Sequence, residues 1–465
     1  MMGRREQGQG QFFYAFNLDE VVPPDHLVRK IDAFLHLSWL HRELGPYYSH
    51  TGRPSVDPEL LIRMLIIGYV FAIRSERGLC AEVQVNLAYR WFCRLGIEDR
   101  IPNHSVFSRV RHERFRESVA LRRVFEHVVS TCIATGLVGG EAFSIDASLI
   151  KADVDESKRV PGDRATSEEA SRAVGEYLAS LDAARSDDED GGYDDGGGGS
   201  QRSEGKPQKA ISLTDPQASW ITRKRSGPFF AYDANYLIDN KLGIIVDAEG
   251  TRANRTDEIA VAETMVERVE HRFGLTPERI AGDTAYGAAK LLKWLWDRGI
   301  TPHVPVWDKS KQTGGRFTKE DFVFDRERNV YICPAGAELT HSGIIDQGRI
   351  LPYRASKNDC STCVLKPSCT TAVARKVSRD IDEDVRDYVR ALANTEAFQR
   401  SRRERKKVEV RFAHMKGIHK LGRLRLRGLN GAKDEVLLTA TAQNLRRLAK
   451  LLFPAPPRSE TRCGA

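Results

Sequence analysis

Within residues 136–306, outside the polar stretch 154–209, the sequence alternates short apolar segments with amphipathic ones, and this alternation restricts the fold more than any other feature. The segments FFAYDANYLIDN and LGIIVDAEG have the length and composition of strands. The segment AAKLLKWLWDRG and residues 256–273 have the residue spacing of amphipathic helices, and we expect Thr256 to cap the second helix and Gly274 to end it. Strands that alternate with helices form a sheet covered by helices, so we predict an α/β fold with helices on the faces of a sheet.

The first 135 residues are predicted to form a helical domain. Asp57, Pro58 and Glu59 supply a helix cap, a proline at the first helical position and an acid in the first turn. They open the apolar run LLIRMLIIGYVFAI, which contains an arginine and is shorter than the roughly 20 residues that a membrane-spanning helix needs. We therefore expect a helical domain and no membrane partner.

A later helix of this domain is rich in arginine. Asn103 or Ser105 is expected to cap the segment SVFSRVRHERF, which brings Arg109 and Arg111 near one surface. A solvated basic face and a DNA-contacting helix explain this pattern equally well. Both interpretations stay open at the level of sequence.

Changes in composition divide the rest of the chain. Residues 154–209 are acidic, glycine-rich and too polar to bury a core, so we predict a disordered insertion there. Dispersed cysteines and irregular strand-like segments follow the alternating region, and helices are expected again over about 381–420 and 434–452. The predicted units are a helical domain (1–135), an α/β core in two parts (136–306 and 381–455), a β-rich cysteine-containing insertion (307–380) and a tail (456–465).

The charge distribution indicates a polyanionic partner. The formal net charge is +8, and residues 401–450 alone hold 15 Lys or Arg against four acids. Nucleic acid is the commonest partner for such a surface. The N-terminus lacks the pattern of a signal peptide, so we expect a cytoplasmic protein whose 8 cysteines are thiols or metal ligands.

Three carboxylates stand out as candidate metal ligands. Asp146 lies on the polar face of a predicted strand, Asp283 follows another strand, and Glu409 lies on a helix among basic residues. Carboxylates that hold two Mg²⁺ ions about 3.5–4 Å apart promote cleavage of phosphodiesters. Taken singly, each of these residues is more often a surface acid or an ion-pair partner.

The order of FSIDASLIKADV, AGDTAYG and RRERKKVEVRFAHMKG resembles the bacterial DDE transposases of insertion sequences. One branch of that family bears a Tyr-Arg-Glu-Lys signature around the third carboxylate. Arg405, Glu409 and Lys416 match three of its four positions, and Arg402 stands where the tyrosine would be. The N-terminal segments RPSVDPELLIRMLIIGYVFAIRSER and IPNHSVFSRVR also resemble the helical domain that precedes the core in this branch.

The resemblance implies a fold, a reaction and partners. It implies a ribonuclease H-like core, a mixed sheet with flanking helices, in which Asp146, Asp283 and Glu409 bind Mg²⁺ or Mn²⁺. It further implies cleavage at the terminal inverted repeats, strand transfer into target DNA, and a homodimer in the synaptic complex. Arg402, Arg405 and Lys416 are expected to contact DNA, together with Arg109 and Arg111 of the N-terminal domain.

Four cysteines in the insertion are candidate zinc ligands. Cys360 and Cys363 form a C-x2-C pair, and Cys333 and Cys369 lie nearby in sequence. Structural zinc is one interpretation and reduced, partly buried thiols are the other. Two functions other than transposition also stay open: an inactive or domesticated DNA-binding protein of the same fold, and a metal-dependent nuclease that does not transfer strands.

Overall fold

The computed structural model of the chain describes residues 16–49, 51–52, 55–161, 210–223, 227–306, 315–341, 343 and 349–454. The chain folds into two compact units. Unit 1 comprises residues 1–132, 418–420 and 438–465, and unit 2 comprises residues 133–417 and 421–437. In the described parts of the chain, no helix is long and apolar enough to cross a membrane.

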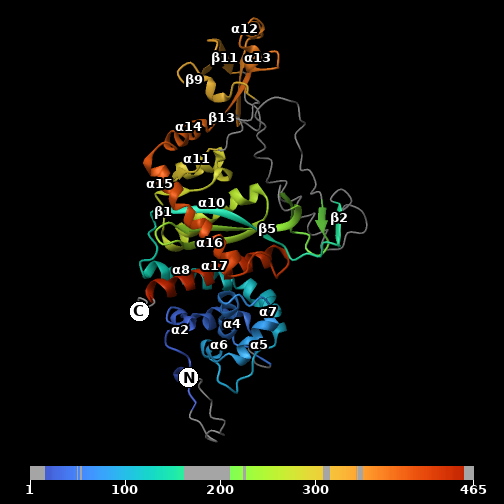
Figure 1. Cartoon of the computed structure of the whole chain (residues 1–465), viewed down its shortest axis with the longest axis vertical. Helices are drawn as coiled ribbons and strands as arrows, with labels where there is room; N and C mark the ends of the chain where they lie inside the picture. The colour runs from blue at the N-terminus through green and yellow to red at the C-terminus, as the bar shows by residue number, and fades with distance from the viewer. Residues whose placement is uncertain are drawn as a thin grey trace, which may run out of the picture. The chain divides into compact units, whose positions relative to one another are not determined.

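Unit 1 is helical (Figure 1), which confirms the predicted helical N-terminal region. Its central helix, α4 (Pro58–Val70), begins where the sequence indicates, because the Asp57 side chain accepts a hydrogen bond from the Glu59 amide. Most α4 side chains are buried, including Arg63, which forms an ion pair with Glu59. The other helices are α1 (Leu18–Val21), α2 (Leu27–Asp32), α3 (Trp39–Leu44), α5 (Glu76–Val85), α6 (Leu87–Phe92), α7 (His104–Val110) and α8 (Ala120–Ala134).

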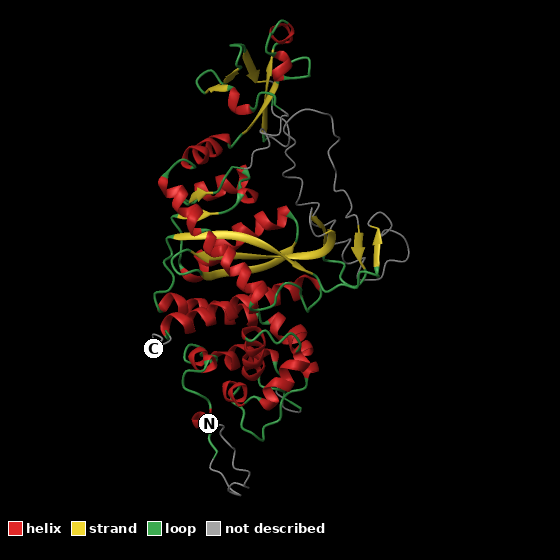
Figure 2. Ribbon diagram, viewed as in Figure 1, coloured by secondary structure: helices red, strands yellow, loops and turns green. Residues whose placement is uncertain are grey.

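Unit 2 contains a mixed sheet, shown with the surrounding helices in Figure 2. The central strand β1 pairs antiparallel with β5 on one side and parallel with β7 on the other. β8 continues the parallel side, while β4 and β6 pair antiparallel with different parts of β5. The strands are β1 (Ala142–Lys151), β4 (Ser219–Arg223), β5 (Gly227–Asp239), β6 (Ile244–Arg252), β7 (Arg279–Ala281) and β8 (Thr301–His303).

Helices cover this sheet, as the alternating pattern predicts, so the α/β fold class is confirmed. α10 (Arg255–Phe273) ends at Gly274 in the left-handed conformation, as expected, but its cap is Asn254 and not Thr256. The Asn254 side chain accepts the Asp257 amide, which is the usual geometry of an N-cap. The other helices are α11 (Ala289–Asp297), α14 (Glu383–Leu392), α15 (Glu396–Glu404), α16 (Lys406–Gly417) and α17 (Gly428–Leu452).

The start of α17 depends on a distant segment. We expected this helix from Asp434, but it begins at Gly428. The carboxylate of Asp215 accepts the Gly428 amide at 3.0 Å, and the Gln217 side chain accepts the Leu429 amide at 2.7 Å. These two acceptors satisfy amides that have no partner inside the helix, and so they extend it by more than one turn.

The predicted disordered insertion (154–209) is only partly tested, because residues 162–209 lie outside the described residues. At its start the prediction was wrong: β2 (Arg159–Pro161) pairs antiparallel with β3 (Ala210–Ser212). The hydrogen bonds of this short ladder offset the ordering cost of polar residues that bury little apolar surface.

The cysteine-containing insertion folds around its own antiparallel sheet, ordered β13-β12-β11-β10-β9. Tyr331, Leu339 and Tyr353 form its core, so its predicted β-rich character is confirmed. Its elements are β9 (Val323–Asp325), β10 (Val330–Ile332), β11 (Glu338–His341), β12 (Ile350–Ala355), α12 (Lys357–Ser361), α13 (Lys366–Cys369) and β13 (Lys376–Asp380).

A buried ionic cluster lies where this insertion leads into α14. Glu383 has no exposed side-chain surface and forms ion pairs with Lys319, Arg386 and Arg390. Burial alone would raise the pKa of Glu383, but the three cations outweigh it and hold that pKa at about 2. Glu383 therefore stays charged and ties the first turn of α14 to the insertion.

Candidate active site

Asp146 and Asp283 lie side by side because of the register between β1 and β7. The last paired residues of these parallel strands are Ser144 and Ala281. Two residues further along each strand direction are Asp146 and Asp283. Neighbouring strands are about 4.8 Å apart, so the two carboxylates fall next to each other at this position of the sheet.

The surroundings of Asp146 make its charge costly. Burial is the main influence and raises the pKa of Asp146 to about 6. The guanidinium of Arg405, 3.6 Å from the carboxylate, lowers that pKa, whereas the charges of Asp283 and Glu258 raise it further. A carboxylate buried beside other acids is a common arrangement for binding a cation.

Asp283 is fixed by the turn that follows β7. Its carboxylate accepts the Ala285 amide at 2.8 Å and caps a short 3-10 turn, Thr284–Tyr286. The preceding residue must be small, because a Cβ atom at Gly282 would lie 3.2 Å from Val304 and 3.3 Å from Ile145. Gly282 thus allows β7 to end close to β1.

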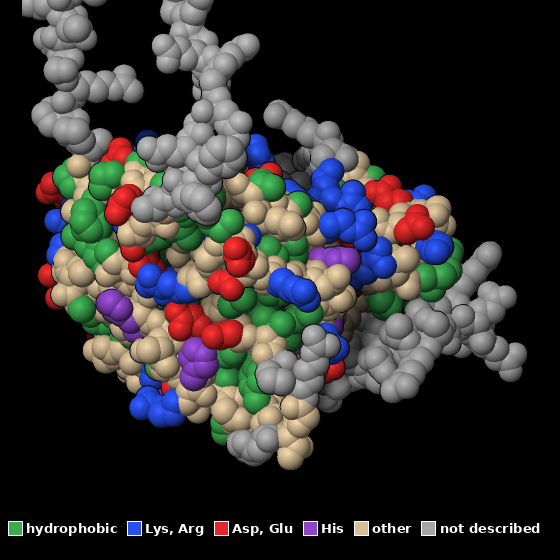
Figure 3. All heavy atoms as spheres, turned by 90° about the horizontal axis from the view of Figure 1, so that it is seen from below, with side chains coloured by type: hydrophobic (Ala, Val, Ile, Leu, Met, Phe, Trp, Pro, Cys, Tyr) green, Lys and Arg blue, Asp and Glu red, His purple; other side chains and the backbone are tan. Residues whose placement is uncertain are grey.

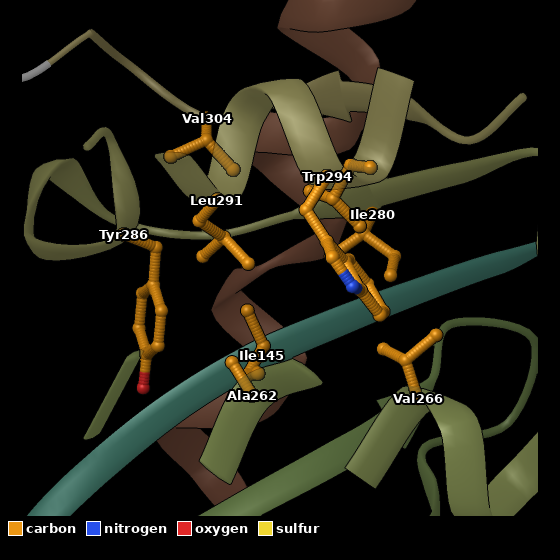
Figure 4. A pocket seen from close by; sticks show the side chains of 9 residues that line it. Ile145, Ala262, Val266, Ile280, Tyr286, Leu291, Trp294 and Val304 are labelled. Carbon is orange, nitrogen blue, oxygen red and sulfur yellow. The ribbon is translucent and has the colours of Figure 1, made fainter. Parts of the chain in front are cut away.

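An apolar pocket is lined by Ile145, which precedes Asp146, and by Tyr286, in the turn that follows Asp283 (Figure 4). Side chains of β1, β7, α10 and α11 line it, among them Ile145, Ile280, Ala262 and Trp294. Tyr286, which is fully buried, forms part of the same wall. The pocket offers little for a polar ligand, and its contribution is to hold β1, β7 and α10 together by apolar packing.

Helix α16 brings the predicted third carboxylate toward β1. Arg405, just before α16, reaches Asp146, and the Lys416 amine lies 2.7 Å from the Ser148 hydroxyl. Phe412, between them, stacks on Tyr236 of β5 with ring centroids 4.9 Å apart. Residues 405, 409, 412 and 416 lie on one face of the helix, so Glu409 belongs to the face that follows β1.

Glu409 is exposed, however, and does not complete a closed cluster. Among the described residues, no three His, Cys, Asp or Glu side chains are arranged to hold a metal ion. Asp146 and Asp283 interact electrostatically, and Glu409 is exposed on α16. The three-carboxylate site therefore stays a prediction.

The predicted DNA-binding arginines of the N-terminal domain differ in exposure. Arg109 is exposed on α7, which Asn103 caps through the Ser105 amide. Arg111 is only 4% exposed, and its guanidinium forms an ion pair with Glu76. This position corrects the expectation that Arg111 lies on a basic surface, because its charge is already neutralised in the interior.

The basic residues near α16 are more accessible. Arg402 is exposed on α15, and Arg405 and Lys416 border β1 as described above. On the face of the molecule seen in Figure 3, basic side chains are interspersed with acidic and apolar ones. Beside β1, the contacts of the described residues place Arg405 on Asp146 and Lys416 on Ser148.

Sequence reasoning missed two residues of this region, Glu258 and Tyr286. Both interact with the aspartate pair. The charge of Glu258 raises the pKa of Asp146. Burial is the main cause that raises the pKa of Tyr286 well above its usual value, and the charges of Glu258 and Asp146 raise it further. Glu258 lies in the first turn of α10, where acids are common because they favour the helix dipole. Because an acid at this position is common in helices, the sequence alone did not single out Glu258.

The four cysteines of the insertion share one neighbourhood. Cys333, Cys360 and Cys369 pack against its core. Burial is the main cause that raises the pKa of Cys369, and the other three cysteines, including Cys363, raise it further. In the described residues these thiols are not arranged as a metal site.

The remaining described cysteines belong to unit 1. Cys93 and Cys132 are buried, and burial raises the pKa of each thiol to about 12. They serve core packing. Cys463 lies outside the described residues.

Comparisons with known proteins agree with these observations. Residues 16–113 match a family model described as a transposase domain, and residues 332–449 match one described as a transposase DDE domain. Among solved structures, the chain is similar to a piggyBac transposase in a synaptic complex with hairpin DNA. That similarity has 11% identity and a TM-score of 0.32, covers 91% of this chain and 79% of the other, and is too weak to support an inference. No curated protein matches the chain.

Proposed function

Since this chain is a DDE transposase of the insertion-sequence kind, we propose that it cleaves DNA at the ends of its element and joins the exposed 3′-hydroxyls to target DNA. The β1–β7 register, which sets Asp146 beside Asp283, is the observation that carries this proposal. The strand order β6-β5-β1-β7-β8, antiparallel on one side of β1 and parallel on the other, also supports a ribonuclease H-like core.

The residues at this site fit Mg²⁺ or Mn²⁺. Asp146, Asp283 and Glu409 offer carboxylate oxygens, which these hard cations prefer. The raised pKa of Asp146 reflects burial and neighbouring negative charges, and a cation would relieve both. When bound, the ions would neutralise charge on the scissile phosphate and acidify the attacking water.

The neighbouring cations suit the phosphate backbone. Arg405 next to Asp146 and Lys416 next to Ser148 lie at two points along β1, so they would grip phosphates on either side of the scissile bond. Arg402 and Arg109, both exposed, would add contacts farther from the reaction. A homodimer that holds both element ends is the expected active form, and the proposed site of action is the cytoplasm.

The function is tested with DNA that carries the terminal inverted repeats of the element. We expect Mg²⁺-dependent nicking and joining by the full chain, and loss of both with Asp146→Asn while DNA binding persists. Asp297→Asn is a matched control, because Asp297 is an exposed carboxylate paired with Lys293 on α11. Equal cleavage by wild type and Asp146→Asn would reject the assignment, and nicking without joining would favour the nuclease alternative.

We further propose that Cys333, Cys360, Cys363 and Cys369 hold a structural zinc ion. The charges of the other three cysteines raise the pKa of Cys369, and the position of Cys333, Cys360 and Cys369 against a small core also supports this proposal. Thiolate is the ligand that zinc prefers in structural sites. The zinc would stabilise the insertion and take no part in the reaction.

A further inference from the structure

The antiparallel sheet of the cysteine-containing insertion carries two cations side by side. Arg354 of β12 pairs with Lys376 of β13, and Thr340 of β11 pairs with Arg354 from the other side. Residues directly opposite each other in an antiparallel pair lie on the same face, with their Cβ atoms about 4.5–5.5 Å apart. All three side chains are exposed. Thr340, Arg354 and Lys376 therefore form one row across three strands, called here the cationic row.

The cationic row faces away from the core of the insertion. Its neighbours along the three strands, Leu339, Tyr353 and Val377, are buried in that core. Successive side chains of a strand point to opposite faces of the sheet, so the row is on the outer face. Packing inside the insertion therefore gives no reason for the two charges to lie together.

The two cations of the row also lack an acidic partner. In the parts of the chain that the structure describes, neither Arg354 nor Lys376 forms an ion pair. Several other arginines of the insertion do pair with acids, namely Arg326, Arg328, Arg349 and Arg379. Like charges directly opposite each other across a ladder are destabilising. The row therefore lowers the stability of the insertion, and a partner with negative charge would account for it.

We propose that the cationic row binds the phosphate backbone of DNA. Phosphates follow one another at about 3.4 Å of helix rise along each DNA strand, so two cations on adjacent β-strands can contact neighbouring phosphates. The Thr340 hydroxyl can donate a further hydrogen bond to a phosphate oxygen. Contacts of this kind position DNA and read no sequence. The inference rests on the proposed function, which supplies DNA as the partner, and it gives the insertion a part in DNA binding.

The experiment measures DNA binding by the full chain at several salt concentrations, with a duplex that carries the element's end and an unrelated duplex of equal length. Each phosphate contact contributes about 0.9 to the slope of log K against log salt concentration. The double variant Arg354→Gln, Lys376→Gln should therefore lose about 1.8 of this slope, and bind about 10–100-fold more weakly at about 0.1 M salt. Both duplexes should lose affinity by the same factor. Arg354→Lys, Lys376→Arg keeps both charges and should bind DNA nearly as wild type does.

Arg326→Gln, Arg328→Gln is the matched control. It removes two exposed arginines of the same insertion, but each of these already forms an ion pair with an acid. The salt slope of this control should hardly differ from that of wild type. Thermal unfolding checks the fold: because like charges face each other in the row, Arg354→Gln, Lys376→Gln should melt no lower than wild type. A lower melting temperature would contradict the premise that the two charges repel.

The binding and cleavage results separate the inference from the proposed function. If the double variant keeps the salt slope of wild type while wild type cleaves element ends, the inference is wrong and the proposed function stands. If the slope falls as expected but wild type never cleaves DNA, the inference stands and the proposed function is wrong. A loss of affinity confined to the duplex with the element's end would also overturn the inference, because phosphate contacts are the same on both duplexes.

Discussion

Replacing Asp146 by asparagine should stabilise the metal-free protein at the same time as it abolishes catalysis. The pKa of Asp146 in the fold is about 6, above its ordinary value of 3.8. The folded state therefore holds a proton that the unfolded state has lost between these two pH values, so stability falls as pH rises through this window. At 1.36 kcal/mol per pKa unit, the ionised carboxylate costs the fold up to about 3 kcal/mol above pH 7.

Asparagine has nearly the same shape and no charge, so Asp146→Asn avoids this cost. Thermal unfolding in EDTA at pH 8 should show the variant melting several degrees above wild type, at about 2–4 °C per kcal/mol. The difference should shrink on acidification and disappear below about pH 4, where both side chains are neutral. Saturating Mg²⁺ should favour wild type instead, because only wild type keeps the full ligand set.

Asp247→Asn provides the contrast. Asp247 is 1% exposed and lies 2.6 Å from the guanidinium of Arg268, so its charge is paired inside the fold. Breaking a buried pair costs about 3–5 kcal/mol, and this variant should melt below wild type. An Asp146→Asn protein that is less stable than wild type at pH 8 in EDTA would refute the electrostatic reasoning.

Three further predictions concern the stability of the fold and its zinc content. Glu383→Gln should lower the free energy of unfolding by about 3 kcal/mol at pH 7, because the pKa of Glu383 is lowered in the folded state. This contribution to stability is present above pH 4.5 and is lost as pH falls toward 2. Urea titrations at pH 7 and pH 3 should show that the loss caused by the substitution is smaller at pH 3. Gly250→Ala should lower the free energy of unfolding by about 1–3 kcal/mol in the same assay, because the added Cβ would lie 2.9 Å from backbone atoms of α17. Gly417→Ala is the control: its Cβ would meet nothing within 4 Å, so stability should hardly change. Metal analysis should find about one zinc per chain, lost in the double variant Cys360→Ser, Cys363→Ser; a fully folded wild type without zinc would end that proposal.

Local patterns predicted much of the fold. The cap at Asp57, the strand around Asp146 and the Gly274 stop of α10 depend on residues that are neighbours in sequence. The alternation of strands and helices then gave the α/β class. The adjacency of Asp146 and Asp283 follows from a register between strands far apart in sequence, and the prediction of it rested on family resemblance.

The features that the sequence did not predict depend on distant partners. α17 begins early because Asp215 and Gln217, more than 200 residues away, accept its first amides. Arg111 is buried because Glu76, 35 residues earlier, neutralises it. Glu258 looks like any acid in a first helical turn until β1 and α10 are placed together. Periodicity and capping rules contain no information on such pairings.

The β2–β3 ladder has a practical consequence for engineering. Because Pro161 pairs with Ala210, the two described positions that flank residues 162–209 lie next to each other. Closing a flexible segment costs only about 0.6 kcal/mol more for each doubling of its length. A short linker or a fluorescent reporter domain could therefore replace residues 162–209. The free energy of unfolding should fall by about 2 kcal/mol or less, and the strands that carry the aspartates should keep their register.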